Sequence, residues 1–337
     1  MTDRIFTPQA NIYLTHCSTV AGKAESQGPL GKYFDFVFPS LSMQEATWEQ
    51  EEAVMVNQAL NTLMKKSDLH AADLDLIFGG DLMNQCTASS FGIKDFDVPY
   101  VGLYGACSTY ALSAILAATA IESGYAQRCV FGASSSFSTA ERQFRSPLEY
   151  GGQRSPTAQI TVTGCGMGLL EGGSQRNGVR WKQGLCGRII DGGIKDVSNM
   201  GAAMAPAAAD TLLRFFRLTE TSPSDYDVIA TGDLGWEGNQ LLKEILAGEG
   251  ISPTKNITDC GLLIYDRKEQ DSHSGGSGCA CSALVHGASL FPALQKGTIK
   301  KLLLVGTGAL MSPMTIQQGL SIPAVAHLIY FEREEQI

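Results

Sequence analysis

The apolar residues of this chain gather in short, nearly continuous runs that contain or end in glycine. Four such runs are DLDLIFGGDL (73–82), RCVFGASSS (128–136), DYDVIATGDL (225–234) and KLLLVGTGAL (301–310). Strands that are buried on both faces read as continuous apolar runs, whereas half-exposed strands alternate between apolar and polar residues. The four runs therefore predict strands of parallel sheets, with helices covering both faces.

Two other segments have the spacing of helices. Residues 47–69 begin with a Thr-x-x-Gln capping box, and their apolar positions recur at helical intervals. Residues 199–217 predict a second helix, rich in small residues, which we expect Pro206 to open because proline is favoured in the first turn. The apolar positions of the first helix are Ala53, Val56, Leu60, Leu63 and Met64.

The order of these segments occurs twice along the chain. The strand run 73–82 is echoed by 225–234, the segment GACSTYALSAI (105–115) by GCACSALVHGA (278–288), and the run 128–136 by 301–310. A repeat this long is not a solenoid unit and indicates one duplicated α/β unit. We predict an N-terminal half, residues 1–175, and a C-terminal half, residues 176–337, which meet near the turn EGGSQRNG.

Composition narrows the classes of function. The 337 residues include 25 basic and 34 acidic side chains, for a net charge of −9, without a dense Lys/Arg cluster. We therefore expect no nucleic-acid partner and no direct attraction to an anionic membrane. No apolar run approaches the roughly 20 residues that span a bilayer, and the first residues lack the pattern of a signal peptide. We expect a soluble protein that reaches a membrane only through partners.

One cysteine lies where a nucleophile would be expected. The nine cysteines are scattered without a C-x-x-C pair, and the five histidines lie far apart, so we expect reduced thiols and no zinc site. Cys107, however, falls between a strand-like run and a small-residue helix. A helix N-terminus lowers the pKa of a thiol and favours the reactive thiolate. Acyl transfer would also need a base or electrophile and donors for the developing oxyanion.

Distinctive motifs occur along nearly the whole chain. They are GPLGKYFD (28–35), GDLMNQ (80–85), GACST (105–109), TAERQFRSPLEYGGQRSPTAQITVTG (139–164), MGAAMAPAAADT (200–211), GGSGCACSA (275–283) and SIPAVAH (321–327). Together they resemble the stage V sporulation protein AD family of spore-forming bacteria, whose members are thiolase-like. Several of the motifs are long and unusual, which makes the resemblance specific.

The resemblance implies an α/β fold, a thiolase-like five-layer αβαβα sandwich made of two duplicated halves, with a homodimer as the default assembly. Members of the family bind dipicolinic acid (pyridine-2,6-dicarboxylic acid), with or without calcium. They serve its uptake into the developing spore and its release at germination, together with membrane proteins of the same stage V sporulation A operon. The resemblance therefore implies a peripheral place at the spore inner membrane. It implies no cofactor other than calcium bound through dipicolinate.

The resemblance also bears on Cys107. The active enzymes of this fold place a histidine just after the strand that mirrors residues 75–80, and this chain has Asp233 at that place. An ionised aspartate cannot donate to an oxyanion, and it raises the pKa of a neighbouring thiol. We therefore expect a non-catalytic site in which Cys107 packs or contacts a ligand. The alternative is a thiolase- or ketoacyl-synthase-like acyltransferase that uses Cys107.

Ligands of parallel α/β sheets bind beyond the carboxyl ends of the strands. Asp81 ends one predicted strand, Cys107 follows another, and Ser135 and Ser136 follow a third. We expect these residues at the floor of one pocket, with Asp233 at the place equivalent to Asp81 in the repeat. The alternative for Asp81 is a role in capping the turn that follows it.

The segment 137–156 has no counterpart of similar composition in the second half. If residues 139–145 are helical, Arg142 and Arg145 share a face, and two guanidinium groups suit a planar dicarboxylate. Tyr150 and Phe144 are candidates for stacking on a pyridine ring. The alternative is an internal network of ion pairs between these arginines and Glu141 or Glu149.

Overall fold

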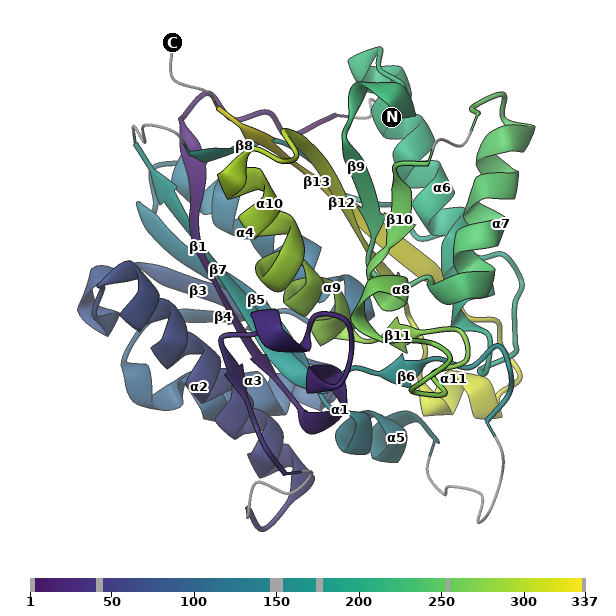
Figure 1. Cartoon of the computed structure of the whole chain (residues 1–337), viewed down its shortest axis with the longest axis horizontal. Helices are drawn as coiled ribbons and strands as arrows, with labels where there is room; N and C mark the ends of the chain where they lie inside the picture. Colours follow the sequence, from purple (N-terminus) through teal and green to yellow (C-terminus); the bar gives the residue numbers. More distant parts are fainter. Residues whose placement is uncertain (1–3, 41–44, 146–153, 174–177, 253–254, 335–337) are drawn as a thin grey trace.

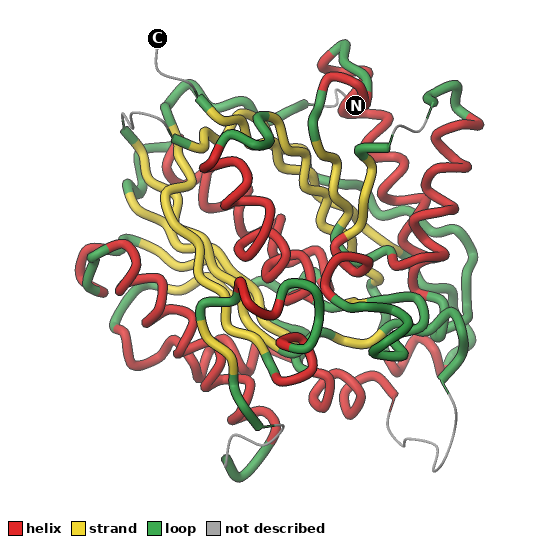
Figure 2. Tube along the Cα trace, viewed as in Figure 1, coloured by secondary structure: helices red, strands yellow, loops and turns green. Residues whose placement is uncertain are grey.

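A computed structural model of the chain describes residues 4–40, 45–145, 154–173, 178–252 and 255–334. Its strands fall into two groups with helices between them and on both outer sides (Figure 2). The first group contains β1 (Ile12–Ala21), β3 (Leu76–Gly80), β4 (Tyr100–Gly102), β5 (Arg128–Ser135) and β7 (Gly164–Gly172). The second group contains β8 (Val179–Leu185), β9 (Val228–Thr231), β10 (Ile257–Asp259), β12 (Lys301–Ala309) and β13 (Ala324–Arg333).

The two groups repeat the same strand order. The first runs β4-β3-β5-β7-β1 and the second runs β10-β9-β12-β13-β8, so each strand has a counterpart. Two of the three pairs of repeated segments fall on counterpart strands, β3 with β9 and β5 with β12, and the third pair falls on the starts of two helices, Thr109–Glu122 and Cys279–Val285. The predicted boundary between residues 175 and 176 lies outside the described residues.

The sheet differs from the prediction in two respects. Within the two groups, β4, β3 and β5 pair in parallel, as do their counterparts β10, β9 and β12. Strands β7 and β13 pair antiparallel with both neighbours, so the sheet is mixed. Antiparallel pairing of Tyr13 with Arg180 and of Leu14 with Val179 also joins the two groups into one sheet. A run of buried apolar residues shows burial on both faces but does not show strand direction.

Helices complete the layers (Figure 1). Helices α2 (Trp48–Ser67) and α3 (Thr87–Ile93) cover the outer face of the first group, and α6 (Met200–Thr219) and α7 (Gly235–Gly248) cover that of the second. Helices α4 (Thr109–Glu122), α9 (Cys279–Val285) and α10 (Phe291–Lys296) fill the layer between the groups, with the π-helical turn His286–Leu290 linking the last two. The layers therefore follow the expected order of helices, strands, helices, strands, helices.

Shorter elements surround the ends of these strands. They are α1 (Lys23–Ser26), β2 (Phe36–Val37), α5 (Phe137–Arg145), β6 (Ile160–Thr161), α8 (Cys260–Ile264), β11 (Gly276–Ser277) and α11 (Pro313–Gln317). Short 3₁₀ turns cover Gly31–Tyr33, Ala71–Asp73, Asn84–Cys86, Lys94–Phe96, Ala106–Ser108 and Pro223–Asp225. No helix among the described residues is long and apolar enough to cross a membrane.

The prediction for residues 47–69 is confirmed. Helix α2 starts after Thr47, whose hydroxyl accepts a hydrogen bond from the Gln50 backbone N–H, as an N-cap residue does. The second helix starts earlier than predicted. Asn199 caps α6 by accepting from the Ala202 N–H at 3.2 Å, so Pro206 lies inside the helix and does not open it. Asn199 supplies an acceptor for the free N–H groups of the first turn about two turns before the proline.

A buried carboxyl group ties α2 to the first group of strands. Glu52 is 1% exposed and accepts hydrogen bonds from the Ser134 hydroxyl at 2.9 Å and the Thr139 hydroxyl at 2.6 Å. Burial, assisted by the charge of Asp81, raises the pKa of Glu52 to about 8. The folded chain therefore keeps a proton on Glu52 at pH values where the unfolded chain has lost it.

This shift gives stability a defined pH dependence. Because the pKa is raised on folding, the free energy of unfolding should fall as pH rises from about 4.5 to about 8, by at most about 1.4 kcal/mol per pH unit from this group. Glu52→Gln keeps the shape of the side chain and removes the titration. We expect urea unfolding at several pH values to give a shallower slope for the variant than for the wild-type protein. Parallel slopes for the two proteins would contradict the assignment.

Candidate functional site

Cys107 lies in a tight turn between strand β4 and helix α4. It belongs to the 3₁₀ turn Ala106–Ser108, and α4 begins at the next residue, Thr109. The Thr109 hydroxyl donates to the Ala106 carbonyl at 2.7 Å. Ala106 has a φ of 51°, a left-handed conformation that costs free energy in a residue with a side chain. The turn holds the Cys107 side chain in place with only 8% of it exposed.

Strand β12 of the second group approaches this turn closely. A Cβ at Gly308 would lie 2.8 Å from the Gly105 carbonyl oxygen and 3.0 Å from the Ser108 nitrogen. A Cβ at Gly306 would lie 2.6 Å from the Ala111 Cβ. The two glycines of this strand therefore let both halves of the molecule meet at Cys107.

Asp233 is the direct partner of Cys107. It follows β9, is 1% exposed and lies close enough to Cys107 for its charge to raise the pKa of the thiol. Its Oδ1 accepts from the Thr307 hydroxyl at 2.6 Å, and its Oδ2 accepts from the Gly278 N–H at 2.9 Å. Gly278 has a φ of 98°, which is open to glycine and which presents its N–H to the carboxylate. These two hydrogen bonds fix the Asp233 carboxyl group.

The electrostatics of this pair oppose a reactive thiolate. Burial raises the pKa of Asp233 to about 6, although its contacts with Cys107, Thr307 and Gly278 lower it. Burial also raises the pKa of the Cys107 thiol well above its usual value, and the charge of Asp233 raises it further. At neutral pH the thiol is therefore protonated. The expectation that an aspartate here raises the thiol pKa is confirmed.

The buried histidines lie elsewhere. In the middle layer, His286 Nδ1 is 2.9 Å from the Tyr110 hydroxyl, and its ring stacks on Phe331 with centroids 5.4 Å apart. Burial lowers the pKa of His286 to about 3 and that of His327 to about 4, so both are neutral. No histidine is among the described residues that line the cavity at Cys107.

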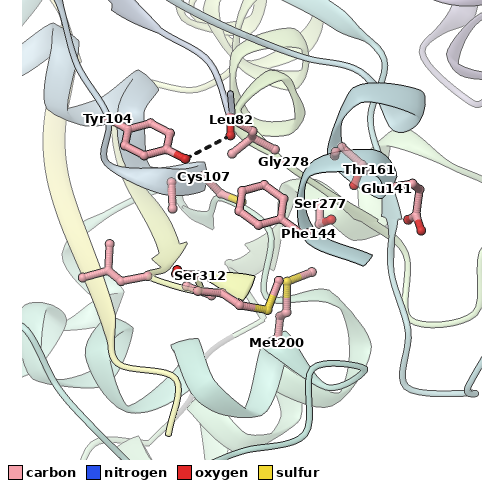
Figure 3. A pocket seen from close by; sticks show the side chains of 15 residues that line it. Leu82, Tyr104, Cys107, Glu141, Phe144, Thr161, Met200, Ser277, Gly278 and Ser312 are labelled. Atoms are coloured by element: carbon pink, nitrogen blue, oxygen red, sulfur yellow. Dashed lines mark hydrogen bonds between the residues drawn. The ribbon is translucent and has the colours of Figure 1, made fainter. Parts of the chain in front are cut away.

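Cys107 opens into a cavity of about 260 Å³. In Figure 3 the rings of Tyr104 and Phe144 lie on either side of Cys107, and Glu141, Thr161 and Ser277 lie along one wall. The Tyr104 hydroxyl donates to the Leu82 carbonyl at 3.3 Å. Apolar side chains make up much of the rest of the wall. These are Leu82, Ala106, Ala140, Met200, Ala309, Leu310 and Met311.

The charge of the wall is negative in the part that the structure describes. Glu141, 8% exposed, is its only charged side chain, and no lysine or arginine lines the described part. Ser277, Ser312 and Thr161 supply hydroxyl groups. Across the described residues, no three His, Cys, Asp or Glu side chains come together as a set that could hold a metal ion.

Asp81 and Asp233 occupy equivalent places in the repeat but have different partners. Asp81 Oδ1 accepts from the Met83 N–H at 2.9 Å, and its Oδ2 accepts from both the N–H and the hydroxyl of Ser89 at 2.8 Å. These bonds close the turn after β3 and fix the first residues of α3, which is the capping role that we considered. Asp81 is not among the residues that line the cavity.

The serines that follow β5 also divide between two environments. The Ser135 hydroxyl donates to the Val162 carbonyl at 2.7 Å and accepts from the Ala280 N–H at 3.1 Å, so it links β5 to the start of α9 behind the cavity. Ser136 lines a second cavity, beside Glu25, and not the one at Cys107. Of the residues that we expected at the floor of the pocket, Cys107 and Asp233 lie together in the structure.

The predicted arginines lie on or beyond helix α5. Arg142 forms an ion pair with Glu49 of α2, and its guanidinium group lies 5.4 Å from the centroid of the Trp48 ring. The ion-pair alternative thus applies to Arg142, with Glu49 as the partner that the structure describes, while Glu149 lies outside the described residues. Arg145 ends α5, and its side chain, like the whole of Tyr150, lies outside the described residues.

The groups that bind Asp233 were not predicted from the sequence. Thr307 lies in the run 301–310 that we predicted as a strand, and Gly278 begins the repeated segment 278–288, but neither was assigned to the site. Glu141 was considered only as a partner for arginine. Its neighbour Phe144, three residues along the same helix, lines the cavity as expected. Glu141 could have been predicted as a cavity residue because it lies three residues before Phe144, on the same face of the predicted helix.

Comparison with solved structures supports this description of the fold. The 3-oxoacyl-[acyl-carrier-protein] synthase III of Aquifex aeolicus VF5 matches 98% of this chain and 100% of its own, with 14% identity and a TM-score of 0.55. The OleA protein of Xanthomonas campestris with bound cerulenin matches 96% of this chain and 98% of its own, with 13% identity and a TM-score of 0.60. These likenesses confirm the thiolase-like fold.

Sequence comparison identifies the family. The family model for stage V sporulation protein AD matches residues 3–332. Stage V sporulation protein AD of Bacillus subtilis (strain 168) is 40% identical over 323 residues, which are 96% of this chain and 94% of that protein. The resemblance inferred from the motifs is therefore confirmed, and the chain belongs to the stage V sporulation protein AD family.

Proposed function

We propose that this protein binds dipicolinic acid, chiefly as its calcium chelate, and does not catalyse acyl transfer. The observation that carries the proposal is the buried Asp233 carboxyl group beside the Cys107 thiol at the base of a small cavity, because its charge adds to burial in raising the pKa of the thiol. A thiol whose pKa is raised is a poor nucleophile because the thiolate is the reactive form. What this site retains from an acyltransferase is its enclosed shape.

The cavity suits a ligand with one aromatic ring. Its volume of about 260 Å³ lies just below the roughly 300–1,000 Å³ of pockets for drug-sized ligands. Phe144 and Tyr104 offer faces or edges to a pyridine ring. The hydroxyls of Thr161, Ser277 and Ser312 offer hydrogen bonds to carboxylate oxygens.

The charge of the wall favours the chelate over the free dianion. The described wall carries the carboxyl group of Glu141, which favours a ligand that brings a cation over a free dicarboxylate. Calcium accepts six to eight oxygen ligands, more than one dipicolinate supplies. Glu141 is therefore the proposed protein ligand to the chelated calcium, in place of Asp81, which closes its own turn.

The spore role follows from the family. We propose that the protein serves uptake of dipicolinic acid into the developing spore and its release at germination, as a homodimer beside membrane proteins of the stage V sporulation A operon. It would reach the spore inner membrane through those partners. Arg142 and Arg145 remain proposed contacts, since both belong to α5, which contributes Ala140, Glu141 and Phe144 to the cavity wall.

Calorimetric titration with dipicolinic acid, with and without calcium, tests the ligand. We expect saturable binding that calcium strengthens, and an affinity about tenfold lower for Phe144→Ala because an aromatic contact is lost. Phe137→Ala is the matched control, since Phe137 lies on the same helix but lines the other cavity. Glu141→Gln should remove most of the effect of calcium. Absence of binding in every condition would reject the proposal, and loss in Arg142→Gln would add Arg142 to the site.

The acyltransferase alternative is tested by mass spectrometry. After incubation with acyl-CoA donors at neutral pH, we expect no acyl group on Cys107, because its thiol stays protonated. Cys186, the exposed cysteine among those described, serves as the internal reference for non-specific acylation. Rapid acylation of Cys107 that is absent from Cys107→Ser and exceeds that of Cys186 would establish the enzyme.

A further inference from the structure

A second cavity, of about 520 Å³, lies on the other side of β6 from the site at Cys107. Helices α1 and α5 and strand β6, which lie close together in Figure 1, contribute to its wall. Thr161 lines both cavities, but Cys107, Glu141 and Phe144 do not line the second one. Its wall carries side chains of both charges, whereas the described wall of the first is apolar apart from Glu141 and a few hydroxyl groups.

Glu25 of α1 is a buried carboxyl group with one unused oxygen in this cavity. It is 1% exposed, and its Oε1 accepts from the Thr163 N–H at 3.0 Å and from the Tyr265 hydroxyl. Its Oε2 is buried without a hydrogen-bond partner among the described residues. A Cβ at Gly22 would lie 2.7 Å from this Oε2, so glycine leaves the oxygen unobstructed.

The carboxyl group also lacks a cationic partner in the described part of the chain. Burial raises the pKa of Glu25, and only hydrogen bonds from Thr163, Tyr265 and its own backbone oppose the rise. A buried acceptor without a partner costs roughly 1–3 kcal/mol, and more when it is charged. Such a group is retained at a cost to stability, which points to a ligand that donates to it.

Arg154 supplies the complementary group on the same wall. Its Nη2 donates to the Asp271 carbonyl at 2.7 Å, which anchors the guanidinium group. Its Nη1 is buried and has no acceptor among the described residues. The charge of Arg154 acts on Tyr265, whose hydroxyl donates to Glu25, so the two unpartnered groups flank one tyrosine.

We propose that this second cavity binds a small zwitterion that carries an ammonium group and a carboxylate. The ammonium group donates to Glu25 Oε2, and the carboxylate accepts from Arg154 Nη1, so both unpartnered groups are satisfied at once. A ligand with a single charge would satisfy one group and leave the other buried without a partner. The site is separate from the one proposed for dipicolinate and does not depend on it.

Saturation-transfer NMR on the full chain tests this site with defined probes. The probes are glycine, β-alanine and 4-aminobutyrate, which separate the two charges by increasing distances, with acetate and ethylamine as ligands of one charge. We expect saturable binding of at least one zwitterion, and about 10- to 100-fold weaker binding in Glu25→Gln and in Arg154→Gln, the effect of losing a charged hydrogen bond. Glu171→Gln, which breaks the 2.9 Å pair with Arg128 outside this cavity, should leave binding unchanged.

The outcomes separate this site from the first. Dipicolinate titration of Glu25→Gln and Arg154→Gln should match the wild-type protein, which also shows that the variants fold. If Glu25→Gln unfolds, the half-buried Arg154 gives the test alone. The proposal is overturned if none of the three zwitterions binds saturably, if acetate or ethylamine binds as tightly as the best of them, or if the Arg154 variant binds undiminished.

Discussion

The contact between the Cys107 thiol and the buried Asp233 carboxyl group connects the two halves of this protein. Asp233 follows a strand of the second half and also binds Thr307 on β12 and Gly278 at the start of α9. A buried carboxyl group is costly unless each oxygen has a donor. The contacts that satisfy Asp233 therefore fix the places of β9, β12, α9 and the Cys107 turn together. Asp233 and burial also keep the Cys107 thiol protonated.

The duplicated architecture explains why two aspartates at equivalent places have different roles. Asp81 faces the turn after β3 and the first residues of α3, whose N–H groups need acceptors. In the second half, Asp259 accepts from the Leu234 and Gly235 N–H groups after β9. Asp233 is consequently free of the capping role and reaches Cys107. Asp81 in the first half and Asp259 in the second half each accept the N–H groups of a turn. Asp233 is the further carboxyl group of the second half, and it contacts Cys107.

Much of the fold could be predicted from the sequence, because buried strands appear as apolar runs and the duplicated unit appears as a repeat of segments. The apolar runs, the repeat and the Thr47 cap each located an element. Strand direction and the start of α6 did not follow, since apolar runs carry no direction and a proline near a helix start competes with the cap at Asn199. Cys107 was found from its place before a helix, and its relation to Asp233 from the family resemblance. Glu141, Thr307 and Gly278 were not assigned to the site, because their roles depend on contacts between segments far apart in the chain.

Measuring the ionisation of Cys107 gives the most direct test that its thiol is protonated at neutral pH. The rate of alkylation of Cys107 by iodoacetamide, followed peptide by peptide over a range of pH, reports the fraction of thiolate. The account predicts that the rate still rises beyond about pH 9, above the ordinary thiol pKa of about 8.5, because burial and Asp233 both disfavour the thiolate. A rate that reaches its plateau near neutral pH would show a thiolate stabilised by the protein and would contradict the account.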